Sequence, residues 1–167
     1  MSLNAIAVFN QPQVRGTVSF HQCNRHHNTI VSFNLVGLPS NSTHGIHIHK
    51  YGILSVDNAC DSTCEHYNPT GDLHGSMELY GNSRHAGDLI NNLVTNSLGE
   101  FTYTYEDPMI NVHDIIGRSI VIHSGVDDMG RWRNDYSNPE RQKGSSTTGN
   151  AGSRIACSVI GLAPSSK

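Results

Sequence analysis

Alternation of apolar with polar residues is the dominant pattern along this chain, and it predicts β-strands. Where the pattern is clear, β-branched and aromatic residues recur with a period of two, as they do in strands that bury one face. Gly, Pro and Asn separate these segments and predict turns between them. The expected strands cover residues 4–10, 14–22, 29–36, 44–49, 99–106, 118–123 and 154–162.

Together these segments predict an all-β domain. No run of ten or more residues shows a convincing helical period of 3.6, so we expect a sandwich or barrel of about eight strands. A chain of 167 residues is long enough for one domain with a sizeable core and too short to predict two. We therefore expect residues 1–167 to form a single domain.

Two long segments interrupt the strand pattern, at residues 50–96 and 124–152. The first contains Cys60, Cys64 and several histidines, and the second is rich in Gly, Ser, Asn and charged residues. Segments of this length without secondary structure are uncommon inside compact domains and are usually functional or disordered. Metal ligation would hold the first segment in place.

Composition narrows the function and the location. A net charge of −3 gives no basic field for nucleic acid, so we expect no nucleic-acid role. The first 20 residues lack the features of a signal peptide and no apolar run approaches membrane length, so we expect no membrane association and a cytoplasmic location. Four cysteines, at 23, 60, 64 and 157, are too few for a disulfide-dense secreted scaffold.

Histidines carry the clearest chemical signal. The strand segment Gly45-Ile-His-Ile-His49 places His47 and His49 on one face, which is half of a copper or zinc site. One such pair arises often through strand alternation, but further potential ligands follow: His66, His74, His85, Asp88 and, at the end of a later strand, His123. The remaining histidines, at 21, 26, 27, 44 and 113, are predicted to be surface or hydrogen-bonding residues rather than ligands.

Seven sequence blocks in a fixed order closely resemble the copper/zinc superoxide dismutase family, especially its cytosolic eukaryotic branch. A viral member of that family is the alternative. They are Gly45-x-His-x-His49, Cys60 with His66-Tyr-Asn-Pro69, His74-Gly75, Arg84-His-Ala-Gly-Asp-Leu89, Gly117-Arg-x-x-x-x-His123, Asp127-Asp-x-Gly130 and Gly149-Asn-Ala-Gly-Ser-Arg-Ile-Ala-Cys157. The resemblance implies an eight-stranded Greek-key β-barrel, an immunoglobulin-like sandwich, with two long functional loops. It also implies that superoxide is disproportionated to dioxygen and hydrogen peroxide by Cu(II)/Cu(I) cycling.

By motif position, the resemblance assigns a role to each of these residues. It implies one copper ion per subunit, held by His47, His49, His66 and His123, and one Zn²⁺, held by His66, His74, His85 and Asp88. His66 would bridge the ions, Asp127 would tie His47 to His74, and Arg154 would dock the superoxide anion beside copper. Cys60 and Cys157 would form a disulfide.

The donor chemistry agrees with this assignment. Four imidazoles suit Cu(II), and three imidazoles with one carboxylate make a closed tetrahedral zinc site. A histidine shared by both ions must lose both ring protons, so His66 can take up a proton when copper is reduced. The catalytic residues implied are therefore His66 and Arg154.

Several positions depart from the family pattern. Glu65 replaces a common proline, Cys64 replaces a usual glycine, and the spacing from His74 to His85 is longer than usual. The second long segment is also longer, and it contributes the basic residues Arg131, Arg133, Arg141 and Lys143. These residues could focus an anion toward copper. A solvated loop of mixed charge is the alternative.

Other interpretations stay open at this point. Cys60, Cys64, His66 and His74 could form a zinc site of the two-cysteine, two-histidine type, in which case all four thiols would be free after denaturation with chelator. A non-enzymatic metal buffer or a decoy that captures a copper chaperone is the alternative function. Gly52, Ile116, Val159 and Leu162 match the patch through which cytosolic members pair, so we expect a homodimer. Whether a chaperone delivers copper is left open.

Overall fold

The computed structural model describes residues 2–53, 55–57 and 59–164. In this part of the chain the strands are Leu3–Gln11 (β1), Val14–Gln22 (β2), Thr29–Val36 (β3), Thr43–His49 (β4), Asn91–Val94 (β5), Phe101–Asp107 (β6), Ser119–His123 (β7) and Arg154–Ala163 (β8). The helical elements are short: Asp61–Thr63 (η1), Met77–Tyr80 (α1), Val112–Ile115 (α2) and Pro139–Thr147 (α3).

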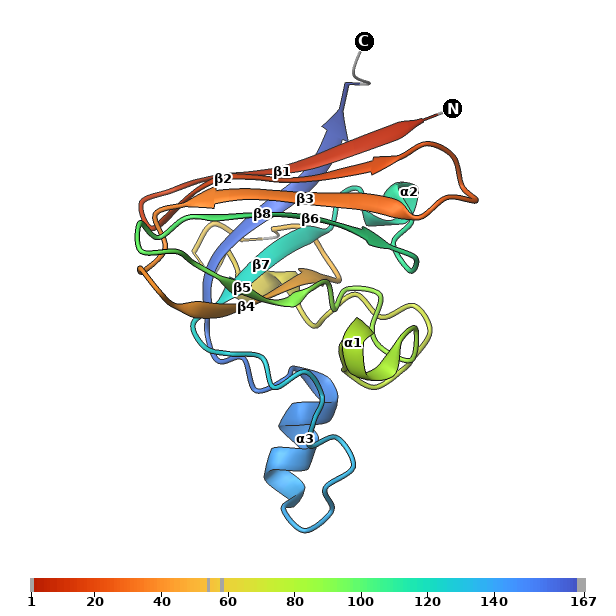
Figure 1. The fold of residues 1–167 in the computed structure, drawn as a ribbon, viewed down its shortest axis with the longest axis vertical. Coiled ribbons are helices and arrows are strands. Elements are labelled where there is room, and N and C mark those ends of the chain that lie inside the picture. The colour runs from red at the N-terminus through yellow and green to blue at the C-terminus, as the bar shows by residue number, and fades with distance from the viewer. Residues whose placement is uncertain (1, 54, 58, 165–167) are drawn as a thin grey trace.

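The strands form one antiparallel sheet that curls into a nearly closed barrel (Figure 1). Their spatial order is β5-β4-β7-β8-β1-β2-β3-β6. β6 therefore pairs with β3, and β7 lies between β4 and β8, as Greek-key connections require. The predicted all-β, eight-stranded barrel is confirmed.

Inward-facing apolar residues fill the barrel because successive residues of a strand point to opposite faces. In β3, for example, Val31, Phe33 and Leu35 are buried, whereas the alternate residues are partly or fully exposed. β4 breaks this alternation. Ile46 and Ile48 face the core, and His47 and His49 on the other face are also buried.

The two long loops cover the outer face of β4. The described parts of residues 50–90 (the first loop) and residues 124–153 (the second loop) lie together at one side of the barrel, and α3 extends away from it (Figure 1). The loops are held by specific contacts. The amide of Gly45 in β4, for instance, donates to the carbonyl of Gly125 in the second loop at 2.8 Å.

Two features differ from the sequence prediction. β5, residues Asn91–Val94, lies inside the segment 50–96 that was expected to lack strands. The second loop contains the helix α3, although its only buried residues are Ser145 and Ser146 and it therefore carries no apolar stripe. Within the described residues, no helix has the length and apolar character needed to span a bilayer.

Candidate metal centre

Strand pairing brings the first histidines together. β4 pairs with β7 in a register that sets His47 opposite Val121 and His49 opposite Ser119. A β-bulge between Ile122 and His123 re-aims the last residue of β7, as bulges do. The first loop adds His66 through an isolated bridge between His49 and His66, so that the rings of His47 and His66 stack with centroids 3.9 Å apart.

Four buried imidazoles form the first group. One ring nitrogen from each of His47, His49, His66 and His123 lies within 4.8 Å of the others. The Nε2 atoms of His49 and His123 are 3.3 Å apart. Nitrogens bound to one ion at about 2.0–2.1 Å in a tetrahedral arrangement are separated by about 3.3–3.4 Å, so this spacing suits a shared metal.

Asp88 organises the second group, in which all side chains are again buried. Its Oδ1 lies 2.8 Å from His66 Nδ1 and 3.3 Å from His85 Nδ1, and its Oδ2 lies 3.0 Å from His74 Nδ1. The Nδ1 atoms of His66 and His85 are 3.4 Å apart. Three imidazoles and one carboxylate therefore converge at the distances expected of a tetrahedral zinc site.

Hydrogen-bond acceptors outside the two groups fix the ring orientation of four histidines. His47 Nε2 donates to Asp127 Oδ2 at 2.5 Å, and His74 Nε2 donates to Asp127 Oδ1 at 2.9 Å. His49 Nδ1 donates to the carbonyl of Cys64 at 2.7 Å, and His123 Nδ1 faces the carbonyl of Gly152 at 3.2 Å. Each ring keeps its other nitrogen for a metal, as metal-bound histidines do.

His66 is different because both of its ring nitrogens face the centre. Its Nδ1 lies in the Asp88 group, and its Nε2 points toward the four-histidine group without a hydrogen-bond partner among the described residues. His47 Nδ1 likewise has no such partner within the described chain. Buried polar atoms without partners are rare, and here they are explained by two metal ions that share His66. The residues present fit copper and zinc.

Electrostatics of the metal-free site follow burial and the two carboxylates. Burial lowers the pKa of His49 to about 2 and lowers those of His47 and His66 well below the usual value, which keeps these rings neutral and able to bind metal. Burial alone would also lower the pKa of His74. Hydrogen bonds to Asp127 and Asp88 outweigh that effect and raise the pKa of His74 to about 10.

Comparison with known protein families identifies the family to which this chain belongs. The family model for copper/zinc superoxide dismutase (SODC) matches residues 14–160. The chain belongs to the copper/zinc superoxide dismutase family. It is similar to the Cu-Zn superoxide dismutase of Talaromyces marneffei, at 37% identity over 164 residues that cover 96% of this chain and 98% of the relative.

Two further relatives also match nearly the whole chain. The Cu-Zn superoxide dismutase of Paramecium bursaria Chlorella virus 1 is 40% identical over 164 residues, which cover 96% of this chain and 79% of the viral protein. A crystal structure of the clock protein EA4 has a TM-score of 0.80 and 34% identity, and the match covers 96% of this chain and 94% of that one. The predicted membership of this dismutase family is confirmed.

The disulfide expected of this dismutase is present. Cys60 and Cys157 are bonded, with their Cα atoms 5.5 Å apart, so Cys60 cannot supply a thiolate to the alternative zinc site of two cysteines and two histidines. Cys23 and Cys64 are the free cysteines of the described chain, and both are exposed.

Two supporting groups were missed by the sequence reasoning. Arg84 is fully buried, forms two hydrogen bonds to Asp107 at 2.9 and 3.0 Å, and donates to the carbonyl of Asp88 at 2.9 Å. Asn91 donates to Asp127 Oδ2 at 3.2 Å and to the carbonyl of Gly75 at 3.0 Å. The position of Arg84 directly before the ligand motif was the one available signal.

Two of the histidines predicted to be non-ligands, His44 and His113, have surroundings that agree with that prediction. His44 is buried inside the fold, and its Nδ1 lies 2.9 Å from the carbonyl of His123, so it supports the backbone of a candidate copper ligand. The side chain of His113 is exposed, as expected. Neither residue contributes a nitrogen to the two metal groups.

Proposed function

We propose that this dismutase converts superoxide to dioxygen and hydrogen peroxide, with copper in the four-histidine group and zinc in the group of three histidines and Asp88. One observation carries the proposal: His66 has its Nδ1 beside Asp88 and leaves its Nε2, on the other side of the ring, buried without a hydrogen-bond partner among the described residues. Copper, when bound, supplies one-electron chemistry by cycling between Cu(II) and Cu(I).

In this proposal His66 is the residue that takes up and returns a proton. The Nδ1 of His66 stays beside Asp88, which leaves Nε2 as the atom that can gain and return a proton. Burial of the ring excludes bulk water from that atom. The hydrogen bond from His66 Nδ1 to Asp88, together with the close approach of His74 and His85 to the same carboxylate, would keep the Nδ1 side of the His66 ring fixed.

Arg154 is proposed to dock the anion. Its guanidinium donates to the carbonyls of Cys60 at 2.8 Å and Asp61 at 3.0 Å, and also to the carbonyl of Cys64, and its side chain is 22% exposed. Burial lowers the pKa of His123, and the Arg154 charge lowers it further, so the guanidinium acts on the copper group. A fixed positive charge attracts the superoxide anion.

The basic residues of the second loop contribute less to steering than their number implies. Arg133 packs over the Tyr80 ring, and Arg141 packs over Trp132 and pairs with Asp135. Arg131 and Lys143 stay exposed and are the two that could still attract an anion.

A superoxide-consumption assay on protein loaded with both metals tests the proposed function. We expect rapid consumption that falls with ionic strength. A metal buffer or chaperone decoy would bind both ions without consuming superoxide, and that result would refute the enzyme proposal. Retention of every candidate ligand and of Arg154 favours the enzyme.

We further propose that two copies pair through the face that contains Gly52, Ile116, Val159 and Leu162. A Cβ atom placed on Gly52 would lie 3.6 Å from Val159 Cγ2, so Gly52 and Val159 are neighbours on this face. Val159 and Leu162 are exposed, and so is the neighbouring Ile53. Sedimentation of the native protein and of Leu162→Glu tests this: the native dimer should become monomeric in the variant.

A cytoplasmic location is also proposed, because exposed free thiols such as those of Cys23 and Cys64 are typical of a reducing compartment. Cell fractionation tests it. Whether a chaperone delivers copper was left open by the sequence, and copper loading in cells with and without such a protein would answer it.

A further inference from the structure

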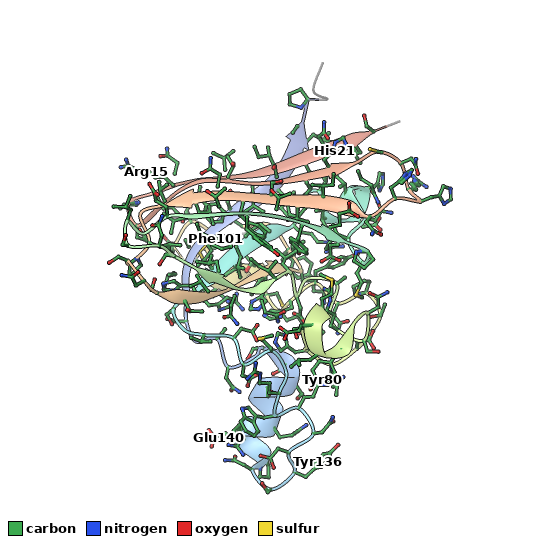
Figure 2. All side chains as sticks on the ribbon, in the orientation of Figure 1. Arg15, His21, Tyr80, Phe101, Tyr136 and Glu140 are labelled. Carbon is green, nitrogen blue, oxygen red and sulfur yellow. A yellow bond between two sulfur atoms is a disulfide. The ribbon has the colours of Figure 1, made fainter. Side chains whose placement is uncertain are left out.

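The two loops that are longer than usual in the family contact each other. Tyr80, in α1, belongs to the extended spacing between His74 and His85, and Arg133 belongs to the extended second loop. The guanidinium carbon of Arg133 lies 3.3 Å from the centroid of the Tyr80 ring. Figure 2 shows Tyr80 where α1 meets the second loop, whereas Tyr136 and Glu140 lie at the far end of that loop.

Hydrogen bonds extend this contact to the zinc side of the metal centre. Arg133 Nη1 donates to the carbonyl of His74 at 3.2 Å and to the carbonyl of Ser83 at 3.0 Å. In the opposite direction, the Tyr80 hydroxyl donates to the carbonyl of Gly130 at 2.8 Å. The first loop and the second loop therefore each donate to the backbone of the other.

Packing around the contact leaves little room for movement. A Cβ atom on Gly75 would lie 2.7 Å from Tyr80 Cδ2 and 2.9 Å from Arg133 Nη1. A Cβ atom on Gly130 would lie 2.6 Å from the carbonyl oxygen of His74. The glycines thus allow the two loops to approach at the residue that follows His74.

His74 is consequently held by the second loop at several of its atoms. Its amide donates to the carbonyl of Ser146 at 2.8 Å, its Nε2 donates to Asp127, and its carbonyl accepts from Arg133. Fixing the backbone of a ligand on both sides limits the rotations by which its ring could leave a metal. A partly buried guanidinium on an aromatic face is a stable way to do this.

We propose that Arg133, stacked on Tyr80, is a positioning residue for the zinc site, which acts through His74 and slows the release of zinc. The inference rests on the proposed zinc site. It gives the lengthened second loop a role in metal retention, and it explains why Arg133 is not available for attracting the substrate.

Zinc release from the native protein loaded with both metals tests the inference. Transfer of zinc to a coloured chelator is timed for the native protein, Arg133→Gln, Tyr80→Leu and the double variant. Loss of an outer partner typically weakens metal binding by about 10–100-fold, so each single variant should release zinc at least about 10-fold faster. Because both residues act through one contact, the double variant should be no faster than the faster single variant.

Arg141→Gln is the matched control. Arg141 lies on the same loop and also packs over an aromatic ring, but that ring is Trp132, within the second loop itself. This variant should release zinc at the native rate. Copper content is measured in every sample and should be equal, because the contact touches a zinc ligand and not a terminal copper ligand.

The outcomes separate the two proposals. Native protein that binds no zinc would refute the proposed function. Native protein that binds zinc, while Arg133→Gln releases it within twofold of the native rate or no faster than Arg141→Gln, would overturn this inference alone. If Arg133→Gln does not fold, Tyr80→Leu carries the test with the same threshold.

Discussion

Replacement of Asp127 by Asn changes one buried carboxylate that is hydrogen-bonded to a histidine of each candidate metal group. The carboxylate accepts four hydrogen bonds in the structure. Oδ1 accepts from His74 Nε2 at 2.9 Å and from the amide of Met129 at 2.6 Å. Oδ2 accepts from His47 Nε2 at 2.5 Å and from Asn91 Nδ2 at 3.2 Å.

An asparagine cannot accept all four bonds. Its amide nitrogen must replace one of the two oxygens, and there it faces two donors, one of which is always a histidine. A buried donor left without an acceptor costs about 1–3 kcal/mol, so the total cost is about 2–6 kcal/mol. The share that falls on the histidine, about 1–3 kcal/mol, corresponds to roughly 5–150-fold weaker metal binding.

Competition with chelators of known affinity measures this effect separately for zinc and copper. If the amide nitrogen faces His74, zinc binding should weaken most, and if it faces His47, copper binding should. Asp128→Asn is the control, because Asp128 bonds Ser145 and Asn150 rather than a histidine. Native affinity for both metals in Asp127→Asn would show that this carboxylate does not orient the ligands, and the reasoning from outer partners would fail.

Arg154→Ala should slow superoxide consumption at low ionic strength by about 10-fold or more, because a fixed positive charge near the copper group raises anion encounter rates. Metal content should be unchanged; lost copper would contradict a docking role. Cys64→Gly should raise the free energy of unfolding, measured by urea denaturation, by about 0.5–2 kcal/mol. Cys64 has φ 67° and ψ −148°, a conformation that costs a residue with a side chain about 1–3 kcal/mol, and the greater entropy of glycine in the unfolded chain offsets part of the gain. A lower denaturation midpoint would contradict this. In the metal-free protein the pKa of His74 is raised to about 10, from 6.5 in the unfolded chain. Protonation of His74 therefore stabilises the fold fully below pH 6.5, and this stabilisation is lost as the pH rises through 10. The Tm of the metal-free protein should therefore fall from pH 7 to 10 relative to that of the zinc-loaded protein; parallel curves would contradict a protonated His74.

The long strands and the clustering of the candidate ligand histidines could be predicted from the sequence because each has a local signature. β3 shows clean alternation, and the His47 and His49 pair sits on one strand face with the other ligands at family spacings. β5 could not be predicted, because Asn91–Val94 has four residues and only Asn91 and Leu93 buried. A strand that short is defined by its pairing with β4 rather than by its own pattern.

Contacts between the loops were beyond prediction for a different reason. Nothing in the sequence around Arg133 indicates that its partner is Tyr80, because the two residues are brought together by the fold of loops far apart in the chain. Arg84 illustrates the same limit. A charged residue is rarely buried unless it is paired, and its partner Asp107 lies at the end of β6.

The disulfide also sets an order of events during synthesis. Cys60 and Cys157 are 97 residues apart, and at about 5–20 residues per second the ribosome needs about 5–20 s to make the second after the first. During that interval Cys60 and Cys64 are both thiols on an unfinished chain, and β8, which also carries Arg154, has not been made. The covalent closure and Arg154, the proposed anion-docking residue, therefore arrive together, so a nascent chain can acquire neither before β8 emerges.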